Sequence, residues 1–498
     1  MCGIIGGFLS EQEAQKSLDA MQRGNDGSKI LSWEGKGLSL GFQRLAIISP
    51  EDEESLQPIL SSDSQAAIAM NGEIFPYRQL REQLKKQGFK FKSRGDAEVL
   101  LNLYLHKGLA FLDELDSMFS AAIFDFKSGK ILLFRDWVGE LPLHYIHSKE
   151  RKQFVFASEF KALMHLPYYS IGAVETVKPG TILELDLESF ELKEHSYYKY
   201  PEGNPPEYKS LKEIGKRVNE LMKASAEERI ISDVPVCCLF SGGVDSMLSA
   251  ILLRDLLKKQ GKGITLYTFH IEGQPVTKQS DLFHAERAAK ELGFTDLRIV
   301  KASKEEVLEK LPEIIFSLEE KRGKDFNLYP AIANFFLAER IAADGFKVVF
   351  TGEGADELLG SYGSSGNYKV SEGEVTSIPY RKKLLQNLFK GVLMRTSKVM
   401  LYNGPIESRT IFLNRPLAEY MMNIPAKFLR KGKCWKMPFV EAFKGDVPEK
   451  LLSRPKARFQ VATGITALKP DIEAAFSKYG GSDEEIFKSL FQEKFGKN

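Results

Sequence analysis

The stretch LFSGGVDS, residues 239–246, decides how the second half of this 498-residue chain is interpreted. It joins an apolar run to a glycine-rich turn and then to a helix-like stretch. Successive backbone N–H groups at such a turn and helix start make a site for phosphate. A Walker A loop would need Gly-Lys-Ser or Gly-Lys-Thr here. The stretch therefore predicts a different kind of phosphate loop, and the simpler alternative is a glycine-rich turn that only caps a helix.

The side chains of the loop fit a bound triphosphate. Ser241 and Ser246 offer hydroxyl donors, while Gly242 and Gly243 let the backbone approach the ligand. An aspartate inside a phosphate loop would repel its ligand unless it held a cation. Asp245 is therefore predicted to bind Mg²⁺.

A second acidic segment, TGEGADE at 351–357, follows another β-rich run. The carboxyl ends of parallel strands are where such folds bind ligands. Asp356 is thus a second candidate metal ligand, and Glu353 a candidate proton acceptor or substrate contact. A plain acidic turn is the alternative.

The pattern around the loop predicts an α/β fold. Strands are expected at 234–240, 265–271 and 347–351, and helices at 211–228, 281–292 and 331–343. Their alternation predicts a parallel sheet with helices on both faces. Beyond about residue 375 the pattern predicts a helical extension.

The first part of the chain has a different pattern of expected strands and helices. Strands are expected at 3–9, 38–48, 66–70, 120–126, 130–134 and 154–157, with helices near 77–87 and 96–106. Many strands with few helices predict packed antiparallel sheets and an α+β class. The Pro- and Gly-rich stretch 200–206 is the best linker candidate. We expect domains at 1–195 and 211–498, joined by a linker at 196–210.

The bulk composition excludes several classes of protein. The length predicts two or more domains. The 69 basic and 67 acidic residues give a net charge of only +2, which makes no case for nucleic acid or an anionic membrane as partner. No apolar run approaches the ~20 residues of a membrane span, and no secretion signal is evident. Only four cysteines occur, which favours a reducing compartment, and we expect the cytoplasm.

A second set of candidate residues begins at the chain start, MCGIIG. Removal of Met1 would make Cys2 terminal and place its thiol beside an α-amine of pKa near ~8, which can act as a base. The alternative is a chance cysteine in a frayed terminus. Asn71 and Gly72 offer donors that suit an oxyanion. Each could also be part of an ordinary turn.

Two more residues could bind the carboxylate and the ammonium group of an amino-acid substrate. Arg44 could grip a carboxylate with two parallel hydrogen bonds. Asp96, which opens an expected helix, could hold an ammonium or simply cap that helix. Taken alone, a surface arginine and a capping aspartate are the simpler explanations.

In this order after Cys2, these residues resemble the class II glutamine amidotransferase domain, an N-terminal nucleophile hydrolase. The resemblance implies an antiparallel β-sandwich flanked by helices. It implies that Cys2 attacks the glutamine amide, that Asn71 and Gly72 form the oxyanion hole, that Arg44 binds the glutamine carboxylate, and that Glu73 and Asp96 bind its amino end. The segment QRGND, 22–26, departs from the family's His-Arg-Gly-Pro-Asp.

The phosphate loop resembles that of the ATP pyrophosphatases. With 351–357, 407–409, 454–459 and Gly464, it makes the second half similar to the synthetase domain of the asparagine synthetase family. The resemblance implies an ATP site that includes Leu239, Ile271, Thr351 and Gly352. It implies that Asp245 and Asp356 bind Mg²⁺, that Lys456 contacts pyrophosphate and the adenylate, and that Glu353 assists attack by ammonia.

Together the two resemblances imply a ligase that uses glutamine, ATP and aspartate and forms asparagine, glutamate, AMP and diphosphate. Ammonia would pass through a channel between the domains. A homodimer is compatible with the resemblance. Departures from the family at Tyr329 and Asn414 leave another carboxylate open as the acceptor. A catalytically silent sensor of nucleotide or glutamine is a third interpretation.

Overall fold

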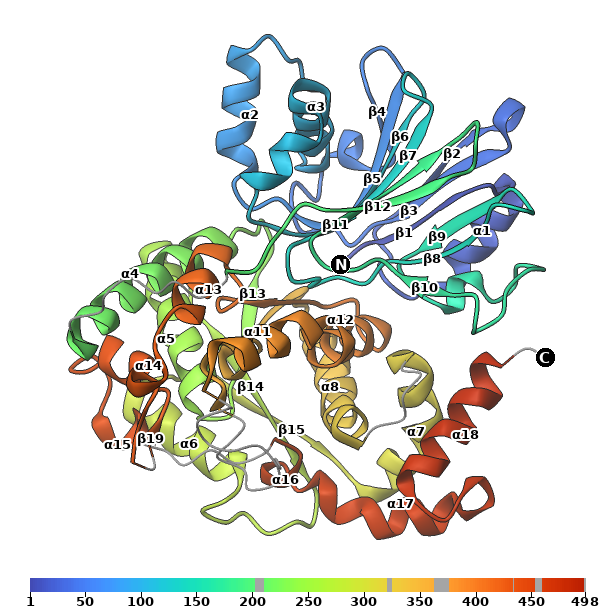
Figure 1. Ribbon diagram of the computed structural model, residues 1–498. Coiled ribbons are helices and arrows are strands. Elements are labelled where there is room, and N and C mark those ends of the chain that lie inside the picture. The colour runs from blue at the N-terminus through green and yellow to red at the C-terminus, as the bar shows by residue number, and fades with distance from the viewer. Residues whose placement is uncertain (202–209, 320–324, 362–375, 433, 453–458, 497–498) are drawn as a thin grey trace.

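The computed structural model describes residues 1–201, 210–319, 325–361, 376–432, 434–452 and 459–496 (Figure 1). Its N-terminal part contains two six-stranded sheets whose neighbouring strands pair antiparallel. The first has the order β10 (Glu175–Thr176), β8 (His144–Ser148), β9 (Gln153–Ala157), β1 (Gly3–Gly7), β3 (Leu38–Gln43), β2 (Ser28–Trp33). The second has the order β12 (Leu192–Ser196), β11 (Thr181–Asp186), β7 (Lys130–Arg135), β6 (Met118–Asp125), β5 (Ala66–Glu73), β4 (Ile59–Leu60).

The two sheets pack face to face, and we call this unit the N-terminal sandwich. Inward side chains from both sheets, among them Phe42, Phe124 and Phe156, form one fully buried apolar cluster. Helix α1 (Glu11–Ala20) packs on the first sheet, while α2 (Tyr77–Lys86) and α3 (Ala97–Lys107) cover the second (Figure 1). The predicted helix-flanked antiparallel sandwich is confirmed.

The sequence interpretation did not include α1. This helix buries only a narrow stripe that includes Ala14 and Leu18, so its apolar pattern is weak. Its start is nevertheless marked: the Ser10 side chain accepts the N–H of Glu13, and the Glu13 carboxylate accepts the N–H of Ser10. This reciprocal capping box is visible in the sequence as Ser-x-x-Glu.

The remainder is built on a five-stranded parallel sheet, as predicted. Its order is β15 (Leu297–Ala302), β14 (Thr265–Ile271), β13 (Val236–Leu239), β16 (Val348–Thr351), β17 (Glu407–Thr410). Helices cover both faces: α4 (Leu211–Arg229), α5 (Val244–Lys259), α6 (Asp281–Leu292), α7 (Lys304–Leu318), α8 (Asp325–Ala343) and α12 (Val392–Tyr402) are the longest before residue 405. We call this unit the parallel-sheet region.

The central strand β13 shows why both faces are covered. Cys238 belongs to the apolar cluster on one face of the sheet and Cys237 to the cluster on the other. Both cysteines are fully buried, so they are core residues, as expected for free thiols on a central strand.

After β17 the chain is mostly helical, as predicted. The described elements include α13 (Arg415–Met422), α14 (Met437–Ala442), α17 (Lys469–Ala475) and α18 (Asp483–Phe495). No helix in the described ranges is long and apolar enough to cross a membrane.

The edge strand β17 lies against the N-terminal sandwich, since Glu407 is close to the Met1 amine and Arg409 is close to Glu73. The buried Arg229 guanidinium donates to the Glu140 carboxylate at 2.9 and 3.0 Å across the junction. The Asn414 amide caps α13 and also donates to Asp116 of the sandwich at 2.6 Å. Asn414, where the sequence departs from the family, therefore serves the junction between the two units.

Two candidate active sites

The cysteine site begins at the amino end of β1, at the junction of the two units. The Cys2 sulfur accepts the Leu45 N–H at 3.4 Å, and its thiol faces the Leu45 carbonyl at 3.7 Å. Met1 precedes it with only 1% of its surface exposed, and its amine lies 3.9 Å from Glu407 of β17. Burial raises the pKa of the Cys2 thiol to about 12 and lowers the pKa of the Met1 amine to about 6. Burial thus favours the neutral form of the Cys2 thiol in this structure.

Asn71 and Gly72 lie within β5, which runs to Glu73 and does not end at Met70 as expected, so the alternative of an ordinary turn is wrong. The strand continues to Glu73 because it pairs with β6 over its whole length. Asn71 is completely buried, and its amide oxygen and nitrogen have no hydrogen-bond partner among the described residues. A buried amide left in this way is costly unless a ligand or water uses it. This supports the predicted role of Asn71 as an oxyanion donor.

Gly72 has a conformation that only glycine adopts easily, with φ of 130°. A Cβ atom there would lie 2.0 Å from the Met118 carbonyl oxygen of β6. The register of the two strands therefore depends on the missing side chain.

We expect Gly72→Ala to destabilise the protein by about 3 kcal/mol, because left-handed strain and a backbone clash add together. Gly88→Ala is the matched control, since Gly88 also has a positive φ, 91°, but open space around it. That change is expected to cost only about 1 kcal/mol. Urea unfolding midpoints of the two variants would measure the difference. Equal midpoints would contradict the clash at Met118.

Arg44 contacts the protein's own backbone in this structure. Its guanidinium donates to the carbonyl oxygens of Ser49 at 2.8 Å and Asp52 at 3.2 Å, with longer contacts to Ile48 and Pro50. The loop it holds borders the cysteine site, since Leu45 contacts Cys2. The predicted grip on a glutamine carboxylate remains a prediction.

Glu73 and Asp96 form the acidic part of the cysteine site. The Asp96 carboxylate accepts the Ile74 N–H at 2.7 Å and makes no capping bond to its own helix. Burial raises the pKa of Asp96 to about 6. Burial, followed by the charges of Glu407 and Asp96, raises the pKa of Glu73 well above its usual range. Two carboxylates in so dry a place suit a cationic ligand such as an α-ammonium.

The parallel-sheet region contributes to the same site. Arg409 of β17 lies 3.5 Å from Glu73 and 2.6 Å from Glu407. The sequence interpretation connected 407–409 only with the family's C-terminal part. Nothing local in the sequence indicates that these side chains would reach the cysteine site, because the contact joins residues more than 300 positions apart.

The phosphate-loop site lies at the carboxyl end of β13, as predicted. The Ser241 N–H and hydroxyl both lie 3.2 Å from the Ser246 hydroxyl, and the Gly243 N–H donates to the Ser241 hydroxyl at 3.3 Å. Gly242 has a φ of 67°, and a Cβ there would overlap the His284 carbonyl of α6 at 2.4 Å. The loop is therefore packed against the neighbouring helix in a shape that only glycine permits.

The structure brings Asp245 and Asp356 together. The Lys436 ammonium forms ion pairs with both carboxylates, with Asp245 and, at 2.7 Å, with Asp356. Burial lowers the pKa of the Lys436 ammonium, but the charges of Asp245 and then Asp356 raise it by more. The pKa therefore lies above its usual range. A cationic group thus already lies between the two predicted metal ligands.

This donor set fits Mg²⁺ that arrives with a nucleotide. In the described ranges there is no group of three or more His, Cys, Asp or Glu residues that could hold a metal ion. Mg²⁺ is commonly bound by one or two carboxylates together with substrate phosphates. Asp245 and Asp356 would supply the carboxylates. Lys436 was missed from the sequence, where a lone lysine before Met-Pro carries no signal.

Glu353 and its neighbours border the same site. The Glu353 carboxylate accepts Arg395 of α12 at 3.0 Å, and its backbone carbonyl accepts the Thr410 hydroxyl of β17 at 2.7 Å. Gly352 packs against Asp245, since a Cβ at Gly352 would lie 3.1 Å from that of Asp245. The segment 351–356 and the phosphate loop therefore form one site.

The remaining predicted ATP-site residues lie at two other strand ends. Leu239 and Thr351 are the last residues of β13 and β16. Ile271 ends β14, is buried, and donates its N–H to Thr463 at 3.2 Å. Lys456 lies outside the described residues, so its predicted contact with pyrophosphate stays a prediction.

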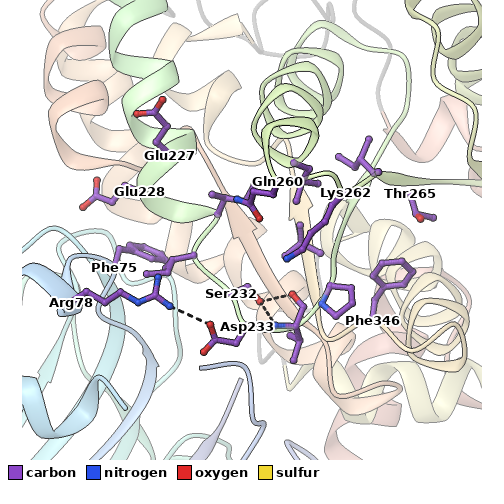
Figure 2. Close-up of a pocket in the computed structure, with 18 of the residues that line it drawn as sticks. Phe75, Arg78, Glu227, Glu228, Ser232, Asp233, Gln260, Lys262, Thr265 and Phe346 are labelled. Atoms are coloured by element: carbon purple, nitrogen blue, oxygen red, sulfur yellow. Dashed lines mark hydrogen bonds and ion pairs between the residues drawn. The ribbon is translucent and has the colours of Figure 1, made fainter. Parts of the chain in front are cut away.

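A separate cavity of about 1250 Å³ lies at the opposite, amino end of the parallel sheet (Figure 2). Phe75 and Arg78 of the sandwich form one wall, and the chain between α4 and β13 forms another. Figure 2 shows Arg78 pointing to Asp233, 3.2 Å away. Asp233 also accepts the Ser49 N–H at 2.7 Å, so it joins the two units beside the loop that Arg44 holds. The cavity is remote from the strand ends that carry the phosphate loop.

Comparisons with known proteins agree with this division into two sites. A family model described as a glutamine amidotransferase domain matches residues 1–199, and one described as asparagine synthase matches 217–404 and 383–497. A putative glutamine-hydrolysing asparagine synthetase 1 of Methanocaldococcus jannaschii is 31% identical, covering 89% of this chain and 84% of its own length.

Two further matches have lower identity. Asparagine synthetase B of Escherichia coli is 29% identical, covering 99% of this chain and 87% of its own. Among solved structures, a glutamine phosphoribosylpyrophosphate amidotransferase from B. subtilis aligns with 53% of this chain and 65% of its own, at 19% identity and a TM-score of 0.33.

Proposed function

Because the chain belongs to the asparagine synthetase family, we propose that it is a glutamine-hydrolysing asparagine synthetase. It is a carbon–nitrogen ligase that takes its amide nitrogen from glutamine. The overall reaction converts aspartate, glutamine and ATP into asparagine, glutamate, AMP and diphosphate. The observation that carries the proposal is that one strand, β17, joins the two sites. Its residue Glu407 contacts the cysteine site, and its residue Thr410 contacts Glu353 of the phosphate-loop site.

At the cysteine site, the thiolate of a terminal Cys2 attacks the glutamine amide, and its own α-amine takes the thiol proton. The Asn71 amide and the Gly72 N–H stabilise the oxyanion that forms. The unpartnered, buried amide of Asn71 supports this role. Glu73 and Asp96 hold the α-ammonium of glutamine, and Arg44 its carboxylate.

At the phosphate-loop site, Ser241, Gly242, Gly243 and Ser246 hold the phosphates of ATP, while Leu239, Ile271, Thr351 and Gly352 surround its AMP part. Mg²⁺ held by Asp245 and Asp356 would offset charge on the phosphates. The Lys436 ammonium, already paired with both aspartates, is placed to do the same for the leaving pyrophosphate. Lys456 is proposed to contact pyrophosphate and the adenylate.

The carboxylate, joined to the α-phosphate of ATP with release of pyrophosphate, is then an acyl-adenylate. Ammonia attacks its carbonyl carbon, the bond to AMP breaks and AMP leaves, and Glu353 takes up a proton from the attacking nitrogen. Arg395, 3.0 Å from the Glu353 carboxylate, fixes its position. Glu407 and Thr410 are three residues apart on β17, which corresponds to about 10 Å. We propose that ammonia travels along this strand, between the sandwich and the parallel sheet.

Aspartate is proposed as the acceptor, and another carboxylate is the alternative. Tyr329, one of the departures that raised that alternative, is 3% exposed and donates its hydroxyl to Asp483 of α18 at 2.8 Å. This contact fixes α8 to the C-terminal helix, which gives Tyr329 a structural use independent of the acceptor. A silent sensor is disfavoured because both sites retain their reactive groups.

Three features remain predictions. The domain limits 1–195 and 211–498 agree with the gap between β12, which ends at Ser196, and α4, which begins at Leu211. All four cysteines are free, which fits the cytoplasm as a reducing compartment. A homodimer is compatible with the family resemblance and stays a prediction.

The purified wild-type protein should form asparagine from aspartate when glutamine, ATP and magnesium are supplied. One AMP and one diphosphate should appear for each asparagine, which chromatography of the reaction mixture would measure. The control omits aspartate and should release glutamate without asparagine. Amide formation on another carboxylate, with aspartate inert, would favour the alternative acceptor.

A further inference from the structure

Five charged side chains form a nearly dry network across the junction of the two units. The N-terminal sandwich supplies three of them and the parallel-sheet region two. None has more than 3% of its surface exposed: they are Arg23, Glu159, Lys161, Glu319 and Lys398. Such groups are rarely this buried unless they are paired.

Opposite charges alternate along the network. Arg23 donates to the Cys2 carbonyl at 3.3 Å and to Glu159 at 2.8 Å. Lys161 lies 2.9 Å from Glu159 and 3.6 Å from Glu319. Lys398 of α12 lies 2.7 Å from Glu319 and ends the series. The chain of contacts thus starts at the backbone of the nucleophile and ends on a helix of the other unit.

Glu319 is the member that joins the units. Besides the two lysines, its carboxylate accepts the backbone N–H groups of Phe160 and Lys161, both at 3.0 Å. It follows α7 directly and has a φ of 48°, which is unfavourable for a residue other than glycine. Although burial opposes ionisation, Lys398 and Lys161 hold the pKa of Glu319 below its usual range, so its charge is retained.

Each of the two lysines packs on an aromatic ring of the other unit. Lys161 of the sandwich lies over the ring of Tyr402 in α12, with its nitrogen 4.9 Å from the ring centre. Lys398 of α12 lies over the ring of Phe160 in the sandwich, at 4.4 Å. Any relative movement of α12 and the sandwich would therefore break several contacts at once.

The same helix carries the partner of Glu353. Arg395, which holds the Glu353 carboxylate, and Lys398 are one turn apart on α12 and project from the same side. One rigid helix thus connects the network that begins at Cys2 to the group that receives the proton at the other site.

Stability alone does not explain this arrangement. Removing five charges from water is costly, and apolar side chains of similar size would hold an interface at least as well. What a buried network of alternating charges does better is to specify a single arrangement of the parts it joins.

We propose that Glu319 is a positioning residue that couples the two reactions, by fixing α12 and its Arg395 relative to the strand that carries Cys2. The proposal rests on the proposed function, since it needs both activities. Loss of the Glu319–Lys398 link would leave each site active but let ammonia escape between them.

The test measures glutamate released per asparagine formed, with glutamine as nitrogen source. In Glu319→Gln and in Lys398→Met this ratio is expected to rise about fivefold or more over wild type, the lower end of the range for coupled sites. Ammonia-dependent synthesis and glutamine hydrolysis measured separately should each stay within about threefold of wild type. Lys398→Arg keeps the charge and should restore most of the coupling.

Two further variants keep the test decisive. The double variant Glu319→Gln/Lys398→Met removes one charge of each sign and leaves Lys161 paired with Glu159, so it should fold even where the single variants do not. It should be uncoupled to the same degree, because the two residues act as one link. Lys178→Met, which removes an exposed ion pair with Glu194, should behave as wild type.

A wild-type ratio in the folded double variant would overturn the proposal and reduce the network to an interface contact. A parallel fall of both separate activities with an unchanged ratio would overturn it as well. These outcomes differ from failure of the proposed function, in which the wild-type protein itself would form no asparagine.

Discussion

Replacing Cys2 with alanine is expected to lower glutamine-dependent asparagine formation about 1,000-fold or more, because no other group at the site can form the covalent intermediate. With ammonium chloride as nitrogen source, the same variant should synthesise asparagine within about threefold of the wild-type rate, since its phosphate-loop site is untouched. Asparagine formation would be measured with each nitrogen source at saturating ATP and aspartate.

Cys434→Ala is the matched control for loss of a thiol. Cys434 is a free, half-buried cysteine in β19 (Cys434–Trp435), remote in the chain from the cysteine site. It should retain glutamine-dependent synthesis. If Cys2→Ala abolished synthesis from glutamine and from ammonia equally, the division of labour between the two sites would be wrong.

The second large effect is expected for Asp245→Ala. This variant should lose asparagine formation about 100-fold or more with either nitrogen source, because the nucleotide phosphates would lose a metal ligand. Lys436 would also lose one of its two ion-pair partners among the described residues and keep Asp356. Glutamine hydrolysis, measured as glutamate release without ATP, should persist.

Asp255→Ala provides a control on the same helix, α5. Asp255 is 55% exposed and pairs only with its neighbour Arg254 at 3.0 Å among the described residues, so its removal should change neither activity. Persistent amide formation by Asp245→Ala would show that the carboxylate pair is not part of the nucleotide site.

The phosphate loop could be predicted from sequence because its geometry is local. The apolar strand, the two glycines and the helix start all lie within eight residues, and the backbone itself forms the site. The parallel sheet followed from the alternation of strands and helices. In the same way, Cys2 and the residues after it could be assigned by their order along the chain.

Contacts between distant segments could not be predicted in this way. Lys436 lies between Asp245 and Asp356, yet it is separated from both by at least 80 residues. The strand β17 is only four residues long, and all four of its side chains are polar or charged, which would suit a surface loop. Their burial depends on partners in the N-terminal sandwich, which no local pattern encodes.

Strand pairing also accounts for the difference between the expected and the observed end of β5. The Asn71-Gly72 pair is typical of a turn, but β5 continues through it because β6 offers partners as far as Glu73. The positive φ of Gly72 fits this strand only because no side chain opposes Met118. Tertiary pairing thus outweighed the turn preference of two residues.

The burial of Met1 against Glu407 affects when Met1 can be removed to make Cys2 the terminal residue. Glu407 is synthesised about 400 residues after Met1, which at ordinary translation rates is roughly 20 to 80 seconds later. In the folded protein Met1 is 1% exposed, so an aminopeptidase would have little access to it there. We therefore expect Met1 to be removed most readily before β17 docks against it.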